Sequence, residues 1–399
     1  MAGALDGLKV LDLSRFIAGP LCGMLLGDMG ADVVKIERPG KGEDARAIAP
    51  HVGGESLYVM MYNRNKRSLG LDFRHKRAQA LLRDLAAQAD VLIENFRPGT
   101  MERMGCGWGS LRAANPRLVM VSISGFGRGG PYAERPCFDV IAQAMSGLME
   151  LTGEPGRMPV PSGAFIVDQV TGLYAALGAV TALQARERSG QGQLVDTSLM
   201  ASAITLLLTA IPESVLLGVE STRRGARDRY SAPANNFQAS DGGWVHLSAG
   251  NDQLFPRFLA QAGLTHLAAD PRFASHAARL ANAAAIETIV AGWVAQHSTA
   301  EVVASMAAAG VPCGKVATVG EMIDDPQVRQ QNMIVELAHP TIGKLPMHGL
   351  TVGLSDTPGE LRRPAPSVGE HTREVLGEWA GLDTAAIDEL LVAGVVGGA

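Results

Sequence analysis

The chain has 399 residues, of which 47% are hydrophobic and 19% are charged; this predicts a folded protein of two or three domains and excludes a disordered chain or a disulfide-stapled peptide. The net charge of -5 provides no overall field for nucleic acid, so we expect no nucleic-acid partner. The cysteines form no CxxC pair, the histidines show no metal-ligand spacing, and no secretory signal or membrane-length apolar run is present, which predicts a cytoplasmic protein without a metal site or a membrane segment.

Short runs of β-branched residues alternate with helical patterns over the first part of the chain. Such alternation is typical of βα units, which build a parallel sheet. The predicted strands cover residues 8–14, 31–39, 90–96 and 118–126, and the predicted helices cover residues 18–30 and 74–89. The pattern therefore predicts an α/β fold with a Rossmann-like large domain.

The second half of the chain changes in texture. Apolar spacing predicts a helix over 168–188 and a buried helix over 196–217. A polar, basic stretch follows, and a strand over 242–250 with later helices indicates a smaller α+β domain. The proline-containing tail is expected to return to the first domain as an extended connector before a final helical piece. The predicted limits are a large domain at 1–220 plus 335–399, a small domain at 226–330, and linkers at 218–232 and 335–368.

Glu37 and Arg38 end the second predicted strand, 18 residues after Gly19. In dinucleotide-binding folds an acidic residue at about this distance holds the ribose hydroxyls, and a neighbouring arginine accommodates a ribose phosphate. The pair indicates a phosphorylated adenosine ribose, as in NADP or coenzyme A, with a surface ion pair of Arg38 as the alternative. A literal GxGxxG at residues 125–130 opens no helical run and is weak support for a dinucleotide site.

Basic residues cluster in three places, at 64–67, 74–77 and 97–103. A solvated surface is the default interpretation of such runs, and we prefer it for the second cluster. Arg97 and Arg103 differ because they follow a predicted strand, where loops of parallel sheets bind ligands. Guanidinium groups there suit phosphate, with Asn95 offering amide hydrogen bonds and Phe96 a flat face for a base.

Two aspartates are candidates for chemistry. Asp168 stands at the predicted start of a helix, close to glycines that let a substrate approach. It fits either a helix N-cap or a carboxylate nucleophile. Asp139 is a second candidate carboxylate, with a helix cap again as the alternative.

A series of motifs in a fixed order resembles the family III CoA-transferases, which include formyl-CoA transferase. The motifs are LKVLDLSRFIAGP, GDMGADVVKIERPGKGEDAR, YNRNKRSLGLDF, ADVLIENFRPGTMERMG, the Asp168 segment, RERSGQGQLVDTSL and GVPCGKVATVGEMIDDPQV. The resemblance implies that Asp168 is a nucleophile that forms an aspartyl anhydride and then an aspartyl-CoA thioester. It implies no permanently bound cofactor, because the CoA thioester is a substrate. The CoA contacts would be Ala18, Arg38, Leu71, Arg74, Asn95, Phe96, Arg97 and Arg103, with Asp139 as the second acid.

The same resemblance implies an interlocked homodimer in which each chain has a large Rossmann-like domain and a small domain. The glycine-rich loop of formyl-CoA transferase is replaced here by APANNFQASDGG, so we do not expect formate or oxalate as substrates. Further departures are Ile17 in place of a glutamine near the CoA, and Arg135-Pro136-Cys137 in place of a lysine-containing stretch. We expect succinyl-CoA or a similar dicarboxylyl-CoA as donor and a small carboxylic acid as acceptor.

A second carboxylate on the substrate would need a cationic partner. Candidates are Arg15, Arg46, Arg223, Arg224, Arg227 and Arg229.

The main competing function is that of a 2-methylacyl-CoA racemase on the same fold, which resembles this chain but uses a histidine for proton transfer. Phe138 occupies that position here, so one proton-transfer group is missing. A noncatalytic CoA-binding protein and an NADP dehydrogenase are two less favoured functions. Cofactor-dependent absorbance changes would identify the dehydrogenase.

Overall fold

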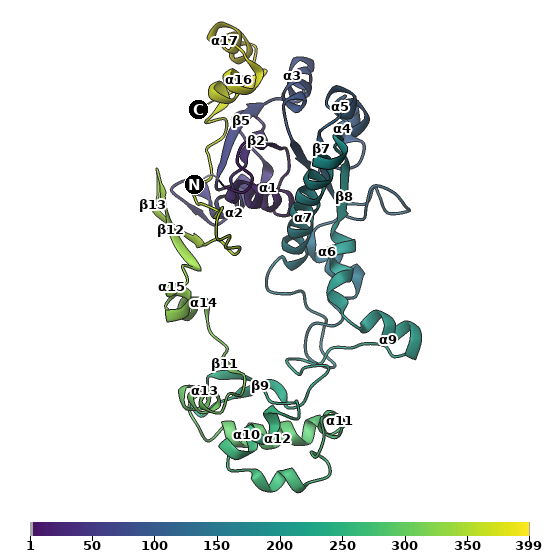
Figure 1. Cartoon of the computed structure of the whole chain (residues 1–399), viewed down its shortest axis with the longest axis vertical. Coiled ribbons are helices and arrows are strands. Elements are labelled where there is room, and N and C mark those ends of the chain that lie inside the picture. The colour runs from purple at the N-terminus through teal and green to yellow at the C-terminus, as the bar shows by residue number, and fades with distance from the viewer. Residues whose placement is uncertain (1–2, 399) are drawn as a thin grey trace. The chain divides into compact units, whose positions relative to one another are not determined.

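The computed structural model describes residues 3–398, which form two compact units (Figure 1). The first unit contains the chain up to Leu148, Pro161–Ile211 and the part from Arg329 onward, and the second contains Met149–Val160 and Pro212–Val328. Residues 149–160 and 212–217, which the sequence assigned to the large domain, thus pack with the second unit. Whether the predicted domains fold independently stays a prediction.

A seven-stranded sheet forms the centre of the first unit, in the order β14-β5-β2-β1-β6-β7-β8. Every neighbouring pair is parallel except β14 and β5. The six parallel strands have the order of a doubly wound Rossmann sheet. In such a sheet successive strands are added outward in one direction up to a switch point, which here lies between β1 and β6, and then in the other. The expected α/β fold with a parallel sheet is therefore confirmed. The strands are β1 (Lys9–Asp12), β2 (Asp32–Glu37), β5 (Lys66–Leu71), β6 (Val91–Glu94), β7 (Val119–Ser124), β8 (Leu194–Ser198) and β14 (Val396–Gly397).

Helices cover both faces of this sheet (Figure 1). Successive side chains of a strand point to opposite faces, so Val10 and Leu11 of β1 belong to two different hydrophobic cores. The core around Val10 is closed by α1 (Ala18–Asp28) and α7 (Ile166–Ser189). The core around Leu11 is closed by α3 (Lys76–Ala87), α5 (Trp108–Ala114), α16 (Thr372–Ala380) and α17 (Thr384–Val392). The central strands are buried on both faces. Because they are parallel, their carboxyl ends lie at one edge of the sheet.

The basic run NRNKRS leads into β5 of the sheet, whereas a solvated surface is the default interpretation of such runs. Arg64 and Lys66 are 1% and 0% exposed. Arg64 is paired with Asp28 at 2.7 Å, and Lys66 is paired with Asp12 at 2.7 Å. Buried cations are tolerated when a carboxylate and further hydrogen bonds satisfy them, and a composition count does not reveal those partners.

The predicted buried helix over 196–217 is wrong. The segment starts in the edge strand β8 and continues as α8 (Leu199–Ile204), a 3-10 turn and α9 (Ala210–Leu217). Leu208 has a φ of 51°, which no right-handed helix accommodates. No described residue of α9 is buried. Apolar content alone did not reveal this break.

The tail returns to the first unit, as expected, but the linker predicted at 335–368 is not extended throughout. It begins with an antiparallel hairpin of β12 (Ile334–His339) and β13 (Gly343–His348). After the extended stretch, α16 and α17 lead to β14, which pairs with β5. The other elements of this unit are β3 (His51–Val52), β4 (Glu55–Ser56), α2 (Leu57–Tyr62), α4 (Thr100–Arg103), α6 (Asp139–Ser146) and a 3-10 helix at Asp44–Ala47.

The second unit combines a three-stranded antiparallel sheet with helices. Its strand order is β11-β10-β9, and Phe258 and Ile286 lie fully buried in its core. The strands are β9 (Ala234–Gln238), β10 (Trp244–Ser248) and β11 (Cys313–Lys315). The helices are α10 (Leu254–Gln261), α11 (His276–Ala281), α12 (Ala283–Val294), α13 (Thr299–Ala308) and α14 (Val319–Ile323), with a 3-10 helix at Thr265–Ala269; α15 (Pro326–Gln330) crosses the boundary between the units.

By length and composition, α7 is apolar enough to cross a membrane, as is the bent pair Leu199–Leu207 and Ala210–Leu217. The most apolar window of α7 is 44% buried, and its small residues Ala175 and Ala179 pack into the sheet core. A core helix of this kind satisfies the same criterion as a membrane span.

Candidate active site

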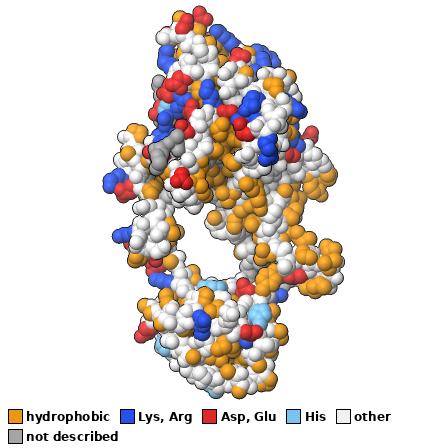
Figure 2. Space-filling view, in the orientation of Figure 1, with side chains coloured by type: hydrophobic (Ala, Val, Ile, Leu, Met, Phe, Trp, Pro, Cys, Tyr) orange, Lys and Arg blue, Asp and Glu red, His pale blue; other side chains and the backbone are white. Residues whose placement is uncertain are grey.

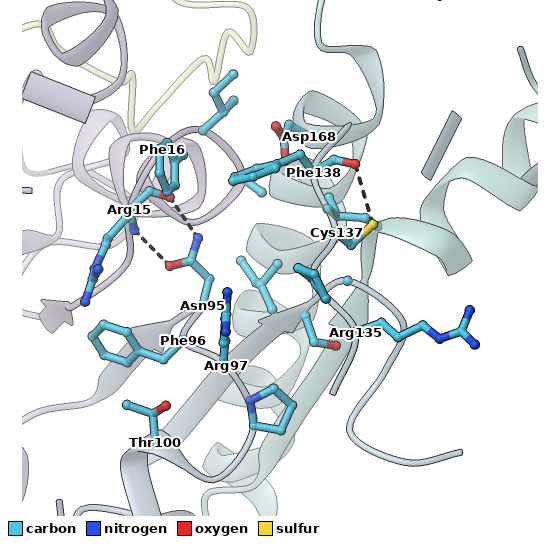
Figure 3. A pocket seen from close by; sticks show the side chains of 18 of the residues that line it. Arg15, Phe16, Asn95, Phe96, Arg97, Thr100, Arg135, Cys137, Phe138 and Asp168 are labelled. Atoms are coloured by element: carbon cyan, nitrogen blue, oxygen red, sulfur yellow. Dashed lines mark hydrogen bonds between the residues drawn. The ribbon is translucent and has the colours of Figure 1, made fainter. Parts of the chain in front are cut away.

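Two cavities of about 500 Å³ each lie at the carboxyl ends of the parallel strands. The first is lined from the ends of β1, β6 and β7 and from the start of α7, and it contains Asp168 (Figure 3). The second is lined from the ends of β1, β2 and β5. The two share Arg15, Asp44, Phe96 and Thr100 and therefore adjoin each other. This is the position between β1 and β6 at which doubly wound sheets bind ligands.

Asp168 lies in the first turn of α7, three residues beyond its N-cap Phe165. The helix end is capped instead by Asp139, whose Oδ2 accepts hydrogen bonds from the backbone N–H groups of Val167 at 2.7 Å and Asp168 at 2.9 Å. Asp139 is 1% exposed, and its Oδ1 accepts a hydrogen bond from Gln143. The N-cap interpretation of Asp168 is therefore wrong: the cap comes from another helix, and the Asp168 carboxylate is left to face the cavity.

Burial raises the pKa of Asp168 to about 7, and the negative charge of Asp139 acts in the same direction. Burial also raises the pKa of the neighbouring Cys137 thiol to about 11, with the charge of Asp168 adding to the effect. At neutral pH the cavity thus holds a carboxyl group that titrates and a thiol that stays protonated. A poorly solvated carboxylate is a stronger base and nucleophile than one in water, which suits attack on a carbonyl.

The residues expected to contact CoA divide between the two cavities. Ala18, Asn95, Phe96 and Arg97 line the first, and Arg38, Leu71 and Arg74 line the second together with Phe96. Arg103 is not among the described residues that line either cavity, but it donates a hydrogen bond at 2.8 Å to Thr100, which lines both.

Several of these side chains already have partners within the chain. Asn95 accepts a hydrogen bond from the Arg15 N–H at 2.9 Å and donates one to the Arg15 carbonyl at 2.8 Å, so its amide holds the loop after β1. Arg74 is bound to Asp72 at 2.9 Å and 3.0 Å through its Nε. The arrangement assigns Asn95 to positioning rather than to free amide contacts with a base.

Glu37 does not occupy the role that its spacing indicated. It is 3% exposed, and both of its oxygens accept hydrogen bonds from Arg46 at 2.7 Å. Arg38, the next residue, is exposed and lines the second cavity. Arg38 is therefore placed where it could contact a phosphate, whereas the Glu37 carboxylate is not free to bind ribose hydroxyls.

The arginines considered for a second carboxylate are mostly committed elsewhere. Arg46 is held by Glu37, and three more are paired with acidic residues of the second unit. Arg224 lines a different cavity, in the second unit. Arg15 lines the cavity of Asp168 and is paired with Asp44 at 3.2 Å. The three paired residues are Arg223, Arg227 and Arg229.

The sequence did not single out several residues that the structure brings to the cavity. Phe16, Asp44 and Thr100 line it, and Arg135, noted only as a departure, joins them. Phe16, Asp44 and Thr100 lie within the family motifs, but the resemblance implied no role for them. Their position after predicted strands, at the carboxyl edge of the sheet, is the signal that would have found them.

The literal GxGxxG also serves a local purpose. A Cβ on Gly125 would lie 2.3 Å from the Cβ of Cys137, so the glycine allows the two loops to approach beside the cavity. No helix follows the motif until α6. Its resemblance to a dinucleotide fingerprint is therefore without structural support. Among the described residues, no group of three or more His, Cys, Asp or Glu is arranged to hold a metal ion.

Comparisons with known proteins agree with this architecture. The model of CoA-transferase family III matches residues 5–372. Succinyl-CoA--D-citramalate CoA-transferase of Chloroflexus aurantiacus is 39% identical, with 95% of this chain and 94% of that protein covered. Succinyl-CoA:glutarate CoA-transferase of Mus musculus is 34% identical, over 98% and 90%.

A solved structure agrees in fold as well. The crystal structure of a CAIB/BAIF family protein from Brucella suis superposes with a TM-score of 0.84 at 36% identity, covering 95% of this chain and all of that one. The family match over nearly the whole chain and the long, similar relatives lead to one conclusion: this chain belongs to CoA-transferase family III and is a CoA-transferase.

Proposed function

We propose that this enzyme moves CoA from succinyl-CoA or a similar dicarboxylyl-CoA to a small carboxylic acid, with Asp168 as the nucleophile. The observation that carries the proposal is the Asp168 carboxylate, partly buried in the cavity with a pKa of about 7 while Asp139 holds the helix end beneath it. A donor of this kind is named for the similar relatives.

The proposed reaction has four balanced steps. An Asp168 oxygen attacks the thioester carbonyl and the C–S bond breaks. CoA departs as a thiolate, and the acyl group stays on Asp168 as an aspartyl anhydride. The thiolate then attacks the Asp168 acyl carbon, which releases the donor acid and forms an aspartyl-CoA thioester. The acceptor carboxylate attacks that thioester, the C–S bond breaks, and CoA thiolate leaves as a second anhydride forms. Finally the thiolate takes the acceptor acyl group, and Asp168 returns as a carboxylate.

We place the phosphate end of CoA in the second cavity and the thioester in the first. Arg38 supplies an exposed guanidinium near the far end, where phosphate groups require positive charge. Phe96 lines both cavities and carries the Arg15 guanidinium 4.8 Å from its ring centre. The extended arm of CoA that ends in the thioester would thus run past Phe96 toward Asp168.

The donor preference would rest on cations around Asp168. Arg15, Arg97 and Arg135 line the same cavity. Arg15 is paired with Asp44, whereas Arg135 is stacked 3.8 Å over the ring of Tyr132. A guanidinium group that turns toward the acyl end of the substrate would favour an acyl chain that ends in a second carboxylate.

We also propose that two chains assemble into an interlocked homodimer. Leu173, Tyr174, Leu177 and Val180 are 53%, 41%, 62% and 42% exposed along one side of α7. Figure 2 shows hydrophobic side chains gathered over α7 and α6. An exposed apolar surface of this kind marks a protein interface. Light scattering should then give about twice the chain mass of 41.8 kDa, and a mass of one chain would refute the dimer.

The covalent route is tested by trapping. The pure enzyme is incubated with succinyl-CoA, acetyl-CoA and oxalyl-CoA, treated with hydroxylamine or borohydride, and analysed by intact mass. We expect an adduct with succinyl-CoA that is lost in Asp168→Ala. An equal adduct in Asp168→Ala would overturn the assignment of the nucleophile. Absence of any adduct, together with deuterium exchange at Cα of a 2-methylacyl-CoA, would establish the racemase function instead.

A further inference from the structure

The loop after β1 holds an aromatic residue in a backbone conformation that such residues avoid. Phe16 has a φ of 65°, in the left-handed region. For a bulky side chain this conformation is unfavourable, and it persists where surrounding interactions impose it. Strain of this kind is common where a side chain must be aimed at a functional site.

Buried groups hold the backbone that leads into Phe16. Glu43, 6% exposed, accepts the Phe16 N–H at 2.9 Å and is paired at 3.0 Å with the fully buried Lys35. Lys35 also donates to the Ser14 carbonyl at 2.7 Å. Together with the Asn95 contacts to the preceding residue, these bonds hold the backbone from Ser14 to the Phe16 N–H.

The strained backbone aims the Phe16 ring at Phe138. The two ring centres are 5.6 Å apart and the planes meet at 82°, an edge-to-face contact. Phe138 precedes α6 and is 60% exposed. Both rings line the cavity that contains Asp168, and Figure 3 shows them on the same side of that cavity as the carboxylate. Phe138 thus contributes little to the core, and its position is explained by the cavity.

We propose that Phe16 and Phe138 form an aromatic cover that keeps water away from the acyl groups carried by Asp168. This inference rests on the proposed function. The reaction to be suppressed is hydrolysis: a water oxygen attacks the acyl carbonyl of the anhydride, the C–O bond to Asp168 breaks, and the free acid leaves as a proton passes to solvent. Each such event ends a cycle without transfer, so an apolar cover favours transfer over hydrolysis.

The test compares two variants that each remove one ring. Phe138→Ala removes the exposed partner. Phe16→Gly removes the strained partner and supplies the residue that accepts its backbone conformation, so loss of the ring is separated from loss of the fold. Phe126→Ala is the matched control, because Phe126 forms an edge-to-face pair with Tyr132 at 5.8 Å and neither ring is among the described residues lining this cavity.

The readout is the ratio of free succinate formed by hydrolysis to product acyl-CoA formed by transfer, together with the lifetime of the trapped adduct. We expect the ratio to rise at least about tenfold in each single variant, with no further rise in the double variant, and to change less than about twofold in Phe126→Ala. Water exclusion by a cover that needs both rings gives this pattern.

An unchanged ratio and adduct lifetime in both single variants would overturn the cover while leaving Asp168 catalysis in place. If the wild-type enzyme forms no Asp168-dependent adduct, the proposed function fails first and the cover falls with it. Should Phe16→Gly not fold, as judged by its melting curve, Phe138→Ala alone decides, because that ring is mostly exposed.

Discussion

If Asp168 is the nucleophile, as proposed, its raised pKa makes the first chemical step depend on pH. In the proposed mechanism the nucleophile is the ionised carboxylate. With a pKa of about 7, its ionised fraction is about 90% at pH 8 and about 10% at pH 6. The single-turnover rate of adduct formation at saturating succinyl-CoA should therefore be about tenfold lower at pH 6 than at pH 8. A rate that stays constant between pH 5.5 and pH 8.5 would show a carboxyl group of ordinary pKa and refute the reasoning.

The same group makes stability depend on pH, in a direction that can be checked without substrate. The folded-state pKa of Asp168 lies above the ordinary value of 3.8, so its protonated form is favoured by folding. Its contribution to stability is complete below pH 3.8 and is lost as the pH rises through 7. At about 1.4 kcal/mol for each factor of ten, the full loss has an upper limit of about 4 kcal/mol, which residual solvent contact reduces.

Asp168→Asn keeps the shape of the side chain and removes this loss. Relative to the wild type, its free energy of unfolding in urea should rise by up to about 2 kcal/mol between pH 5.5 and pH 8. The comparison at two pH values cancels effects that the amide has at every pH. A difference between the proteins that does not change with pH would contradict a buried, titrating carboxyl group at this position.

Three further perturbations test other parts of the structure. Asp139→Asn removes a like charge but keeps an oxygen acceptor, so the acid limb of the Asp168 rate profile should move to lower pH; an unmoved limb would exclude that charge as a cause. Lys66→Met leaves Asp12 buried without its cation, and urea unfolding should show a loss of about 3–5 kcal/mol that a second change, Asp12→Asn, partly restores. Leu177→Arg places a charge in the exposed apolar side of α7 and should shift the mass of the proposed dimer in light scattering toward one chain, whereas an unchanged mass would contradict an interface on this side of α7.

Apolar periodicity was sufficient for much of the sheet. β1, β2, β6 and β7 fall inside the predicted runs because their side chains are buried on both faces, which leaves continuous β-branched sequence. β5 was not predicted because it begins with Lys66 and Arg67, whose burial depends on acidic partners from other strands and helices. Pairing between distant residues is a tertiary property that local composition does not contain.

The candidate site divides in the same way. The motif order predicted Asp168 and a set of CoA-contacting residues, because those positions recur in the resembling family, and most of them line the two adjoining cavities. Phe16 was not predicted as a residue of the site because its position depends on a backbone angle and on a hydrogen bond to the Glu43 carboxylate. For Glu37, spacing along the chain indicated a contact with a ligand. In the folded chain its carboxylate is instead hydrogen-bonded to Arg46.

The pairing of β14 with β5 also bears on how this chain is made. At the ribosome β5 emerges early, and its outer edge has no strand partner until α17 and β14 have been synthesised. An open strand edge is a site for wrong pairing between nascent chains. Protein extended or truncated at the C-terminus should consequently suffer first in yield and aggregation during expression, before any effect on catalysis is seen.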